Sequence, residues 1–585
     1  MSHLKGGKVD VSLIHSLAGA NLISLIEKHS GSKALVWDTQ LQGPAGLIAK
    51  YTVLKEYGVE KMYPIENPPL PNCVAKHIIF ICRPKLELME HIALSIKIDL
   101  QNNRVGMDRN YHLIFAPRRS LLCLNKLEHC GIKGSLKTIE EFCCYFFPFD
   151  SDLLSMEIPD AFREYNLEND PTSLYHVARS IIFLQSKFGP IGRVWGKGPA
   201  SKQVHDLLLK LQKEDFQFER GSCIDQMILI DRSVDLISTL ATQLTYEGLI
   251  DEVFGLNGNA VTIPADKLMS NDERHMESLQ EDKKTLILDS GDPLYADLRD
   301  KNFNGVGPYL SKRAKLISAQ LEDRHEKSVP EMKLFVQRLP AILANKKSLS
   351  QHTAIAECIK EVTDTYEFLD GLQVEQEFLN CMQSDKAHPF IEDMISQKKP
   401  LIKVLRLICL QCLTSSGLKS RLLDYYKREI VQVYGLEVLP ALINLEKVGL
   451  LKVQSGTRQY TVLRKGLQLT VEDTSEVNPT DISYVHCIYA PLSVRLVEHL
   501  TKNGGWKQLQ DYLGLLPGPT LEYLSGNPLN NNNSTKVVLI FFIGGCTFAE
   551  ISALRFISKQ EDSNVEFVIA TTKLINGNTF LNSLM

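Results

Sequence analysis

The feature that most restricts the fold is an apolar strand-like run that ends abruptly in charge. Residues 227–230 (MILI) have the pattern of a buried strand. Asp231, Arg232 and Asp235 follow directly, and residues 247–254 then have the pattern of an apolar and acidic helix. A charged cluster at the carboxyl edge of an α/β sheet is a usual place for a ligand. It is equally typical of a domain junction, where an Asp–Arg pair holds one unit against the next.

Residues 1–149 alternate strand-like runs with helical stretches. Strands are predicted at residues 33–37, 61–65, 78–82 and 112–116, with a last strand at 143–149. Amphipathic helices are predicted between them, at residues 47–57 and 85–96. This alternation predicts an α/β fold with a mostly parallel, doubly wound sheet.

The next part of the chain has too few strands to complete a second sheet. Helices are predicted at residues 173–188 and 201–213, with a glycine-rich loop at 189–198 between them. The missing strands are found at residues 537–543 and 567–570, joined by a helix from Phe548. We therefore expect a second α/β domain that is split by a long insertion.

The insertion is predicted to be mainly helical. Its expected helices are residues 294–321, 331–344, 349–365, 375–383 and 401–413, and residues 270–284 and 530–533 are expected to be polar linkers. Residues 331–359 suggest a helical hairpin hinged around 345–348, a natural platform for another helix.

Residues 437–463 resemble a winged helix: a helix, Gly449, and a β-hairpin that turns at Ser455-Gly456. A helix that reads DNA presents Lys and Arg to phosphates, but residues 437–451 hold only one Lys and no Arg. We therefore expect this segment to contact protein rather than nucleic acid.

Composition excludes several classes of function. The 585 residues are enough for about three to five structural units. A net charge of −4 and a pI near 6.5 do not indicate a basic surface for nucleic acid or a general attraction to anionic lipid. No signal peptide or membrane-spanning segment is expected, and the 13 cysteines in apolar contexts suit reduced thiols in the cytosol.

The glycine-rich loops do not satisfy the motifs of nucleotide-binding proteins. Gly196-Lys197 lacks the earlier glycine and the following Ser or Thr of a phosphate-binding loop. Gly544-Gly545 lacks the third glycine of a dinucleotide fingerprint, whereas Thr547 and Glu550 have the spacing of a helix capping box.

No enzyme signature remains among the other candidates. Cys409 and Cys412 have zinc-ligand spacing but lie in a helical pattern with no second ligand pair nearby, so both are expected in the core. The Asp231, Arg232 and Asp235 cluster has no histidine or nucleophile beside it, which favours a structural ion-pair network. We expect no catalytic residue, no cofactor and no metal.

The sequence resembles the Sec/Munc (SM) family, whose members bind SNARE proteins and promote membrane fusion. Residues 230–235 (IDRSVD), 244–247 (LTYE) and 544–550 (GGCTFAE) match motifs of the family in the same order. Residues 299–304 (RDKNFN) and 490–496 (APLSVRL) are most similar to its vacuolar branch. Two departures, at residues 238–240 and at Ile488, affect turn geometry and remove no functional group.

The resemblance implies an arch of three domains. Domain 1 is residues 1–149; domain 2 is residues 150–247 and 481–585; the inserted domain divides into residues 248–360 and 361–480. The implied function is to template SNARE assembly as a subunit of the HOPS and CORVET tethering complexes. The protein would then be cytoplasmic and peripheral on late endosomes and lysosomes, bound through the complex. The alternative function is a nucleotide-binding α/β enzyme that uses the glycine-rich loops.

The resemblance also implies where partners bind. SNARE contact is expected on the helical hairpin, at Met332, Lys333, Phe335, Val336, Arg338 and Leu339. A partner of the vacuolar protein sorting-associated protein 16 type is expected at Lys427, Tyr434 and Leu436. Asp231, Arg232 and Asp235 are expected to fix the angle between domain 2 and the insertion.

Overall fold

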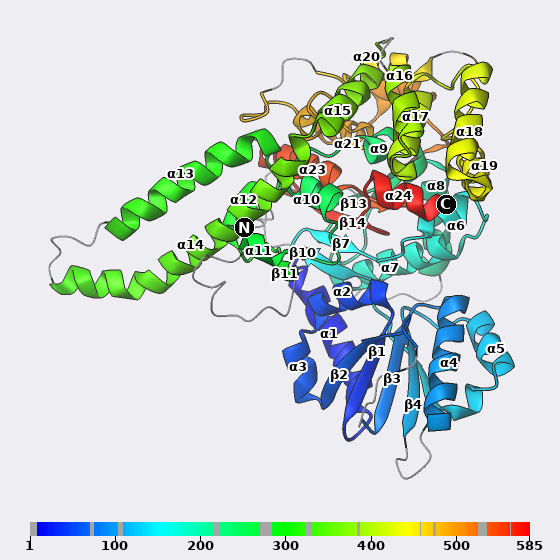
Figure 1. Ribbon diagram of the computed structural model, residues 1–585, viewed down its shortest axis with the longest axis vertical. Coiled ribbons are helices and arrows are strands. Elements are labelled where there is room, and N and C mark those ends of the chain that lie inside the picture. Colours follow the sequence, from blue (N-terminus) through cyan, green and yellow to red (C-terminus); the bar gives the residue numbers. More distant parts are fainter. Residues whose placement is uncertain are drawn as a thin grey trace. The chain divides into compact units, whose positions relative to one another are not determined.

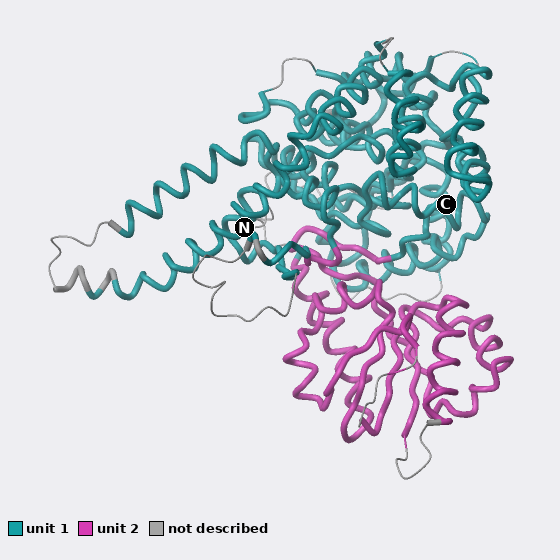
Figure 2. Tube along the Cα trace, in the orientation of Figure 1, with its two compact units in different colours: residues 1–9, 158–256, 261–585 teal, residues 10–157, 257–260 magenta. Residues whose placement is uncertain are grey.

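The structure is a computed structural model that forms two compact units. It describes residues 9–68, 70, 75–102, 109–213, 221–268, 283–322, 329–382, 387–454, 456, 458–471, 475–524, 535–561 and 563–585. Unit 2 comprises residues 10–157 and 257–260, and unit 1 comprises the rest of the described chain (Figure 2). Most of residues 270–284 and all of residues 530–533, the predicted linkers, lie outside the described residues.

Unit 2 contains a parallel sheet in the order β2-β1-β3-β4-β5 (Figure 1). The predicted doubly wound sheet is confirmed, and its central strand β3 is buried along its whole length. The strands are β1 (Lys33–Trp37), β2 (Val59–Pro64), β3 (His77–Cys82), β4 (Asn110–Phe115) and β5 (Leu136–Glu141). The helices are α1 (Ser12–Glu27), α2 (Thr39–Ile48), α3 (Tyr51–Glu56), α4 (Leu86–Asn102) and α5 (Leu121–His129).

The prediction of the last strand of this sheet at residues 143–149 was wrong. The fifth strand is β5, whose alternating polar residues are only partly buried because it lies at the sheet edge. Cys144 is buried without being in a strand, and its thiol donates to the Phe146 carbonyl at 3.3 Å. Residues 147–150 form a short strand, β6 (Phe147–Asp150), which pairs antiparallel with β7 (Leu153–Ser155).

Unit 1 contains a sheet assembled from two distant parts of the chain. Within this unit the strand order is β12-β8-β9-β13-β14, where β12 is Thr520–Leu524 and β8 is Arg193–Lys197. Strand β9 (Gln226–Asp231) pairs in parallel with β13 (Lys536–Ile543), which in turn pairs in parallel with β14 (Val565–Thr571). The predicted split of this sheet by an insertion is therefore confirmed. Helices α8 (Pro199–Gln212) and α23 (Phe548–Lys559) pack against its strands, and α7 (Thr172–Phe188) packs against α8.

The glycine-rich segment at residues 189–198 is not a loop throughout, as was predicted. It contains β8 (Arg193–Lys197), which pairs antiparallel with β12 (Thr520–Leu524) and parallel with β9. A larger residue than glycine at position 196 would crowd the neighbouring strand, because a β-carbon there would lie only 3.3 Å from the Leu521 side chain. The glycine allows close approach of two strands rather than flexibility.

Three helix predictions in the inserted region differ from the structure. The helix predicted at residues 375–383 is α15 (Tyr366–Leu379), which begins nine residues earlier and ends before residue 380. Residues 294–321 form two helices, α12 (Pro293–Leu298) and α13 (Phe303–Glu322), because Asn302 between them bridges to Thr245 and its amide donates to the Tyr484 carbonyl at 2.9 Å. Residues 331–344 and 349–365 are instead parts of one helix, α14 (Val329–Thr363). No Gly or Pro interrupts residues 345–348, so the backbone ladder continues through the predicted hinge.

The hairpin of this region is thus made by α13 and α14, which lie side by side and extend from the rest of unit 1 (Figure 1). The other helices of eight or more residues are α10 (Tyr246–Val253), α15 (Tyr366–Leu379), α16 (Ala387–Ser396), α17 (Leu401–Thr414), α18 (Ser420–Tyr434), α19 (Leu439–Val448), α20 (Gln459–Gly466), α21 (Leu492–Asn503) and α24 (Gly577–Leu584). None of the described helices is long and apolar enough to cross a bilayer.

The β-hairpin predicted after Gly449 was also wrong. Gly449 ends α19 in the left-handed conformation, as expected, but the second predicted strand is helix α20. Tertiary packing favours the helix, since Tyr460 and Leu463 are buried on one face of α20 and the Tyr460 hydroxyl donates to the Leu379 carbonyl at 2.8 Å. Ser455, at the predicted turn, lies outside the described residues.

A proline in the middle of α14 tests whether the helix is continuous. Lys346 is exposed, so Lys346→Pro removes a ladder hydrogen bond at a cost of about 3 kcal/mol without disturbing the core. We expect amide hydrogen exchange around residues 342–350 to accelerate about 100-fold. Lys346→Ala is the matched control and should leave exchange unchanged. Equal exchange in the two variants would instead support a hinge at this point.

Candidate functional site

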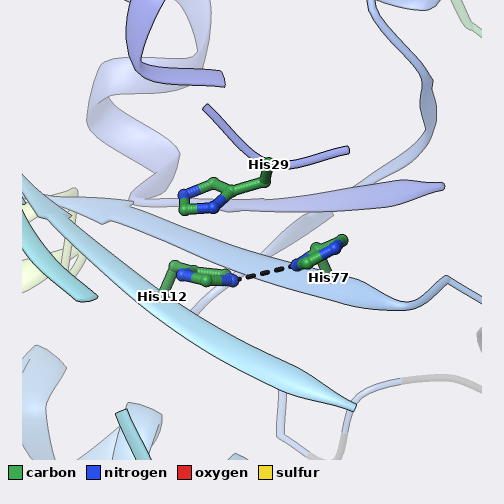
Figure 3. Close-up of side chains that lie close together, drawn as sticks. All are labelled: His29, His77 and His112. Atoms are coloured by element: carbon green, nitrogen blue, oxygen red, sulfur yellow. Dashed lines mark hydrogen bonds between the residues drawn. The ribbon is translucent and has the colours of Figure 1, made fainter. Parts of the chain in front are cut away.

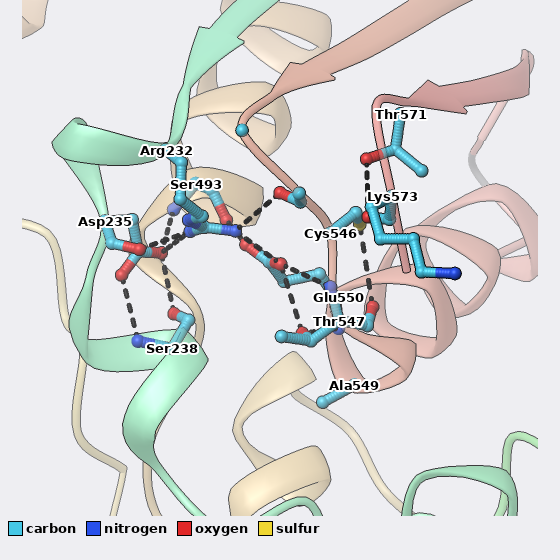
Figure 4. Close-up of polar contacts among 12 residues, drawn as sticks. Arg232, Asp235, Ser238, Ser493, Cys546, Thr547, Ala549, Glu550, Thr571 and Lys573 are labelled. Atoms are coloured by element: carbon cyan, nitrogen blue, oxygen red, sulfur yellow. Dashed lines mark hydrogen bonds and ion pairs between the residues drawn. The ribbon is translucent and has the colours of Figure 1, made fainter. Parts of the chain in front are cut away.

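Arg232 is the centre of a buried charge network in unit 1. It follows directly after β9, in the 3-10 turn η2 (Arg232–Val234), and its side chain is fully buried. Its Nη1 donates to Glu550 Oε2 at 2.8 Å and to the Gly545 carbonyl at 3.3 Å, and its Nη2 donates to the Asp235 carbonyl (Figure 4). The guanidinium therefore joins the end of β9 to the first turn of α23.

Asp235 extends the network to a third segment. Its carboxylate accepts hydrogen bonds from the Ser238 amide at 3.1 Å, the Ser238 hydroxyl at 2.6 Å and the Ser493 amide at 2.8 Å. The Ser493 hydroxyl, at the start of α21, donates in turn to Glu550 Oε1. Chain segments on both sides of the insertion are thus joined through one set of polar contacts (Figure 4).

Asp231 faces other partners than Arg232 and Asp235 do. Its carboxylate accepts hydrogen bonds from the Ala200 amide at 2.8 Å and the Ser233 amide at 2.9 Å. Burial raises the pKa of Asp231, and these hydrogen bonds oppose the rise. Gly198 has a φ of +104°, and a β-carbon there would lie 2.3 Å from the Asp231 β-carbon. The glycine before α8 therefore makes room for Asp231.

The two helix starts that could bind a phosphate are both occupied by the protein's own side chains. At α8 the Ala200 amide is bound by Asp231. At α23 Thr547 and Glu550 form the predicted capping box, with the Thr547 amide donating to Glu550 at 3.0 Å. The Ala549 amide donates to Gln243 Oε1 at 2.9 Å. Amide groups that would bind an anion are thus already satisfied.

The charged state of the Arg232–Glu550 pair is maintained by mutual attraction. Burial by itself raises the pKa of Glu550, but Arg232 and the hydrogen bonds from Ser493 and Thr547 hold that pKa below its ordinary value. Burial opposes the charge of Arg232 as well, yet Glu550 and Asp235 raise its pKa on balance. The pair therefore remains ionised at neutral pH.

A second network joins the insertion to α23. Arg555 of α23 contacts Glu247 of α10 at 3.4 Å and Asp300 at 3.3 Å, and the Tyr295 hydroxyl donates to Glu247 at 2.8 Å. Lys559 binds Asp300 at 2.8 Å. Burial favours the neutral form of Asp300, but Arg555 and Lys559 lower its pKa to about 2.

A third contact joins α17 to α10. Arg406 donates to both carboxylate oxygens of Glu252, at 2.8 Å and 2.9 Å, and also to the Leu240 carbonyl. The sequence analysis did not identify Arg406, Arg555, Asp300 or Ser493 as members of these networks. The signal that could have found Arg406 is a charge in the middle of the apolar run of residues 401–413, whose only other charged residue is Lys403. Cys409 and Cys412 of the same helix are buried, as predicted.

The residues predicted to contact SNAREs lie on the first part of α14. Lys333, Val336 and Arg338 are exposed, and Leu339 is half-buried. The side chains of Met332 and Phe335 lie outside the described residues. Val336 is 58% exposed and Leu343 is 50% exposed; seven residues apart, they share one helix face.

The residues predicted to contact a partner subunit lie around the end of α18. Leu436 is 72% exposed, but the Tyr434 hydroxyl donates to the Lys399 carbonyl and Lys427 pairs with Glu446. Leu439 and Ile443 of α19 are exposed beside Leu436 in sequence. We name these three apolar residues, Leu436, Leu439 and Ile443, the α19 patch.

Comparison with known proteins identifies the family. Residues 33–583 match the Sec1 family. The chain belongs to the Sec1 family. The predicted Sec/Munc resemblance is thereby confirmed, and so is the predicted similarity to the vacuolar branch of the family.

Relatives of this Sec1-family chain match it from end to end. It is 48% identical to vacuolar protein sorting-associated protein 33A of Rattus norvegicus, over 100% of this chain and 99% of the relative. It is 34% identical to the vacuolar protein-sorting-associated protein 33 homolog of Arabidopsis thaliana, over 100% of this chain and 98% of the relative.

Solved structures share the Sec1-family fold. One is the SM protein Vps45 in complex with the Qa SNARE Tlg2, with a TM-score of 0.58 and 16% identity over 98% of both chains. Another is the Unc18–syntaxin 1 complex from Monosiga brevicollis, with a TM-score of 0.57 and 15% identity over 97% of this chain and 98% of that chain.

Removing Arg232 tests the importance of the central network. Arg232→Met leaves Glu550 buried without its cation, which should lower the free energy of unfolding by about 3–5 kcal/mol in urea titrations. The pKa of Glu550 is lower in the folded protein than the 4.5 of the unfolded chain. The stability that its charge contributes is therefore fully present above pH 4.5 and is lost as the pH falls through the folded pKa. The difference in free energy of unfolding between the variant and the wild type should therefore be largest at neutral pH and should become smaller at acidic pH.

The matched control is a surface pair in the same unit. Arg163 and Glu168 are both largely exposed, so Arg163→Met should cost less than about 1 kcal/mol. The double variant Arg232→Met/Glu550→Gln keeps an acceptor for the capping box and removes the orphaned charge, so it should regain part of the lost stability. If the double variant loses as much free energy of unfolding as the two single variants lose together, Arg232 and Glu550 are not coupled and the network is contradicted.

Proposed function

We propose that this protein binds SNARE proteins and templates their assembly during membrane fusion in vacuolar or endolysosomal trafficking. Support comes first from the end-to-end similarity to vacuolar protein sorting proteins. A protein of the same fold has been solved in complex with a Qa SNARE. The observation that carries the proposal in this chain is the long helix α14, whose first part presents an exposed face.

The physical task of a template is to reduce the entropy cost of ordering. A disordered segment loses about 1–2 kcal/mol of conformational free energy for each residue that it orders. A rigid surface that holds such a segment in its bound conformation lowers the barrier to the next step. Helix α14 has 35 residues, or about 52 Å measured along its path, with Pro340 inside it, and it offers a long platform for a helical partner.

The second half of α14 is held rigidly. Ile355, Cys358 and Ile359 are buried in the core cluster that includes helices α10, α12 and α13. His352 is hydrogen-bonded on both ring nitrogens, to the Tyr246 hydroxyl at 3.0 Å and to Asp292 at 3.2 Å. The first part of the helix lacks such burial at its described side chains, where Lys333, Val336 and Arg338 are exposed. An anchored base and an exposed end suit a docking platform.

A charge on the exposed face of α14 tests the proposal. Val336→Asp places a carboxylate where an apolar contact is proposed and should not disturb folding, since Val336 is 58% exposed. We expect binding to purified endolysosomal SNARE segments to weaken at least about ten-fold, as expected for a lost hot-spot contact. Binding is measured by titration calorimetry, and liposome fusion with the same SNAREs is the functional readout.

Val362→Asp is the matched control for this test. Val362 is also a valine of α14 and is 40% exposed, but it lies at the opposite end of the helix. The control should bind SNARE segments as the wild type does. If both variants bind equally well, or if the wild type does not bind, the proposed use of α14 is refuted.

We propose further that the protein works as a subunit of the HOPS and CORVET complexes, on late endosomes and lysosomes. The proposed contact for a subunit of the vacuolar protein sorting-associated protein 16 type is the α19 patch. An exposed leucine or isoleucine by itself is ordinary, but three on consecutive turns form a stripe that suits a helical partner. Tyr434, two residues before Leu436, donates its hydroxyl to the Lys399 carbonyl, and Lys427 of α18 pairs with Glu446 of α19, so both are already engaged within the chain.

The α19 patch is tested by Leu436→Asp. Leu436 is 72% exposed, so the change should leave the melting temperature within a degree or two while co-purification with the partner subunit is lost. Leu524→Asp, at another exposed leucine of the same unit, is the control and should retain the partner. Retention by Leu436→Asp would exclude this patch as the contact.

The proposed function includes no catalytic step. The alternative of a nucleotide-binding enzyme is disfavoured because the amides at the starts of α8 and α23 already donate to Asp231, Glu550 and Gln243. The buried charges are paired with each other rather than arranged around an open pocket. Their proposed role is to fix how the inserted helices join the split sheet of unit 1.

A further inference from the structure

Three buried histidines of unit 2 lie together at the amino-terminal end of its sheet. His77 is the first residue of β3, His112 belongs to the neighbouring strand β4, and His29 lies in the link between α1 and β1. The ring of His29 is stacked on that of His112 (Figure 3), and the two ring centroids are 3.7 Å apart. No short motif announces this set, because the three residues are far apart in the chain.

The distances fit ligands of one metal ion. His77 Nδ1 and His112 Nε2 are 3.0 Å apart, and one ring nitrogen from each of the three histidines lies within 4.8 Å of the others. Two imidazoles on a tetrahedral zinc ion, with Zn–N bonds of about 2.0–2.1 Å, hold their nitrogens about 3.3 Å apart. His77 and His112 are therefore already at ligand spacing. His29 is stacked on His112, so its ring would have to turn as well as shift to direct a nitrogen at the same ion, and its place in a link permits this.

The remaining ring nitrogens have the outer contacts that metal-binding histidines require. His77 Nε2 lies 3.1 Å from the Ser30 carbonyl, which accepts only, so this nitrogen carries the proton and leaves Nδ1 with a lone pair. His112 Nδ1 lies 2.8 Å from the Thr138 hydroxyl. A hydroxyl can accept as well as donate, so it permits the His112 tautomer with the proton on Nδ1 and a lone pair on Nε2.

The surroundings keep the three rings neutral. Burial lowers the pKa of each histidine, and it lowers that of His112 to about 3, where His29 and His77 add to the effect. A neutral imidazole is the form that binds a metal. Binding then needs no net loss of protons from the set: the proton between His112 Nε2 and His77 Nδ1 moves to His112 Nδ1.

We propose that His29, His77 and His112 form a zinc site, with water as the fourth ligand. Three imidazoles and an open position are a common zinc donor set. The ion would connect the link before β1 to the starts of β3 and β4, and so stabilise the sheet of unit 2. The competing arrangement is a chain of hydrogen bonds from Thr138 through His112 and His77 to Ser30, with His29 only stacked on it.

The test uses the purified full chain with Zn²⁺ and Co²⁺ as probes, under reducing conditions. We expect one site per chain in Zn²⁺ titrations that is absent from His29→Ala, and a Co²⁺ absorption spectrum of a tetrahedral nitrogen site. His29 is the ligand to remove first, since its ring is stacked on His112 and is not part of the hydrogen-bonded chain from Thr138 to Ser30. Thr138→Val should weaken Zn²⁺ binding by about 10–100-fold through loss of its bond to His112.

The controls separate this site from other ligands for zinc. His129→Ala removes an exposed histidine of the same unit and should leave the site intact. Cys143→Ser removes an exposed thiol and should do the same. Zn²⁺ should raise the melting temperature of the wild type but not of His29→Ala. Equal Zn²⁺ binding by wild type and His29→Ala, or a Co²⁺ spectrum with sulfur ligands, would establish the hydrogen-bonded chain and overturn the proposal.

Discussion

The ion pair between Arg232 and Glu550 is the interaction on which the rest of unit 1 depends. Both side chains are fully buried and 2.8 Å apart, and they come from parts of the chain that flank the insertion. Removing two charges from water costs several kcal/mol for each ion, so such a pair adds little net stability. What it does is exclude other arrangements, because neither charge can be buried unless the end of β9 meets the start of α23.

Two further buried arginines fix the positions of inserted helices in the same way. Arg555 needs Glu247 and Asp300, and Arg406 needs Glu252, so each buried charge commits another element to a single position. Glu247 and Glu252 lie on α10, and Asp300 lies in the link before α13. Helix α13 is the first helix of the hairpin and α14 is the second. A segment of the chain whose junctions are fixed by charge can present a long helix in a defined direction. Hydrophobic contacts alone are less directional.

The sequence predicted the elements whose pattern is local, and failed where distant contacts decide. The apolar runs of β1, β3, β9 and β13, and the capping box of Thr547 and Glu550, are visible in a few neighbouring residues. The helix α20 was mistaken for a strand because its state depends on Tyr460 meeting Leu379. Likewise β8 was taken for a loop, since only pairing with β12 and β9 makes Gly196 a strand residue. Arg232 was recognised as special, but Glu550, 318 positions away, was read only as a cap.

The buried charges also explain why a family motif can look like an active site without being one. Asp231, Arg232 and Asp235 end a strand of an α/β sheet, where ligands are usually bound. In this chain Asp231 accepts from the Ala200 amide and fills the space beside Gly198, and Glu550 accepts from the Thr547 amide in the α23 capping box. These two carboxylates therefore stand where an anionic ligand would bind. A helix start that binds a carboxylate of its own chain gains the electrostatic stabilisation that a phosphate would provide. These contacts make the end of β9 a fixed junction with α8 and α23.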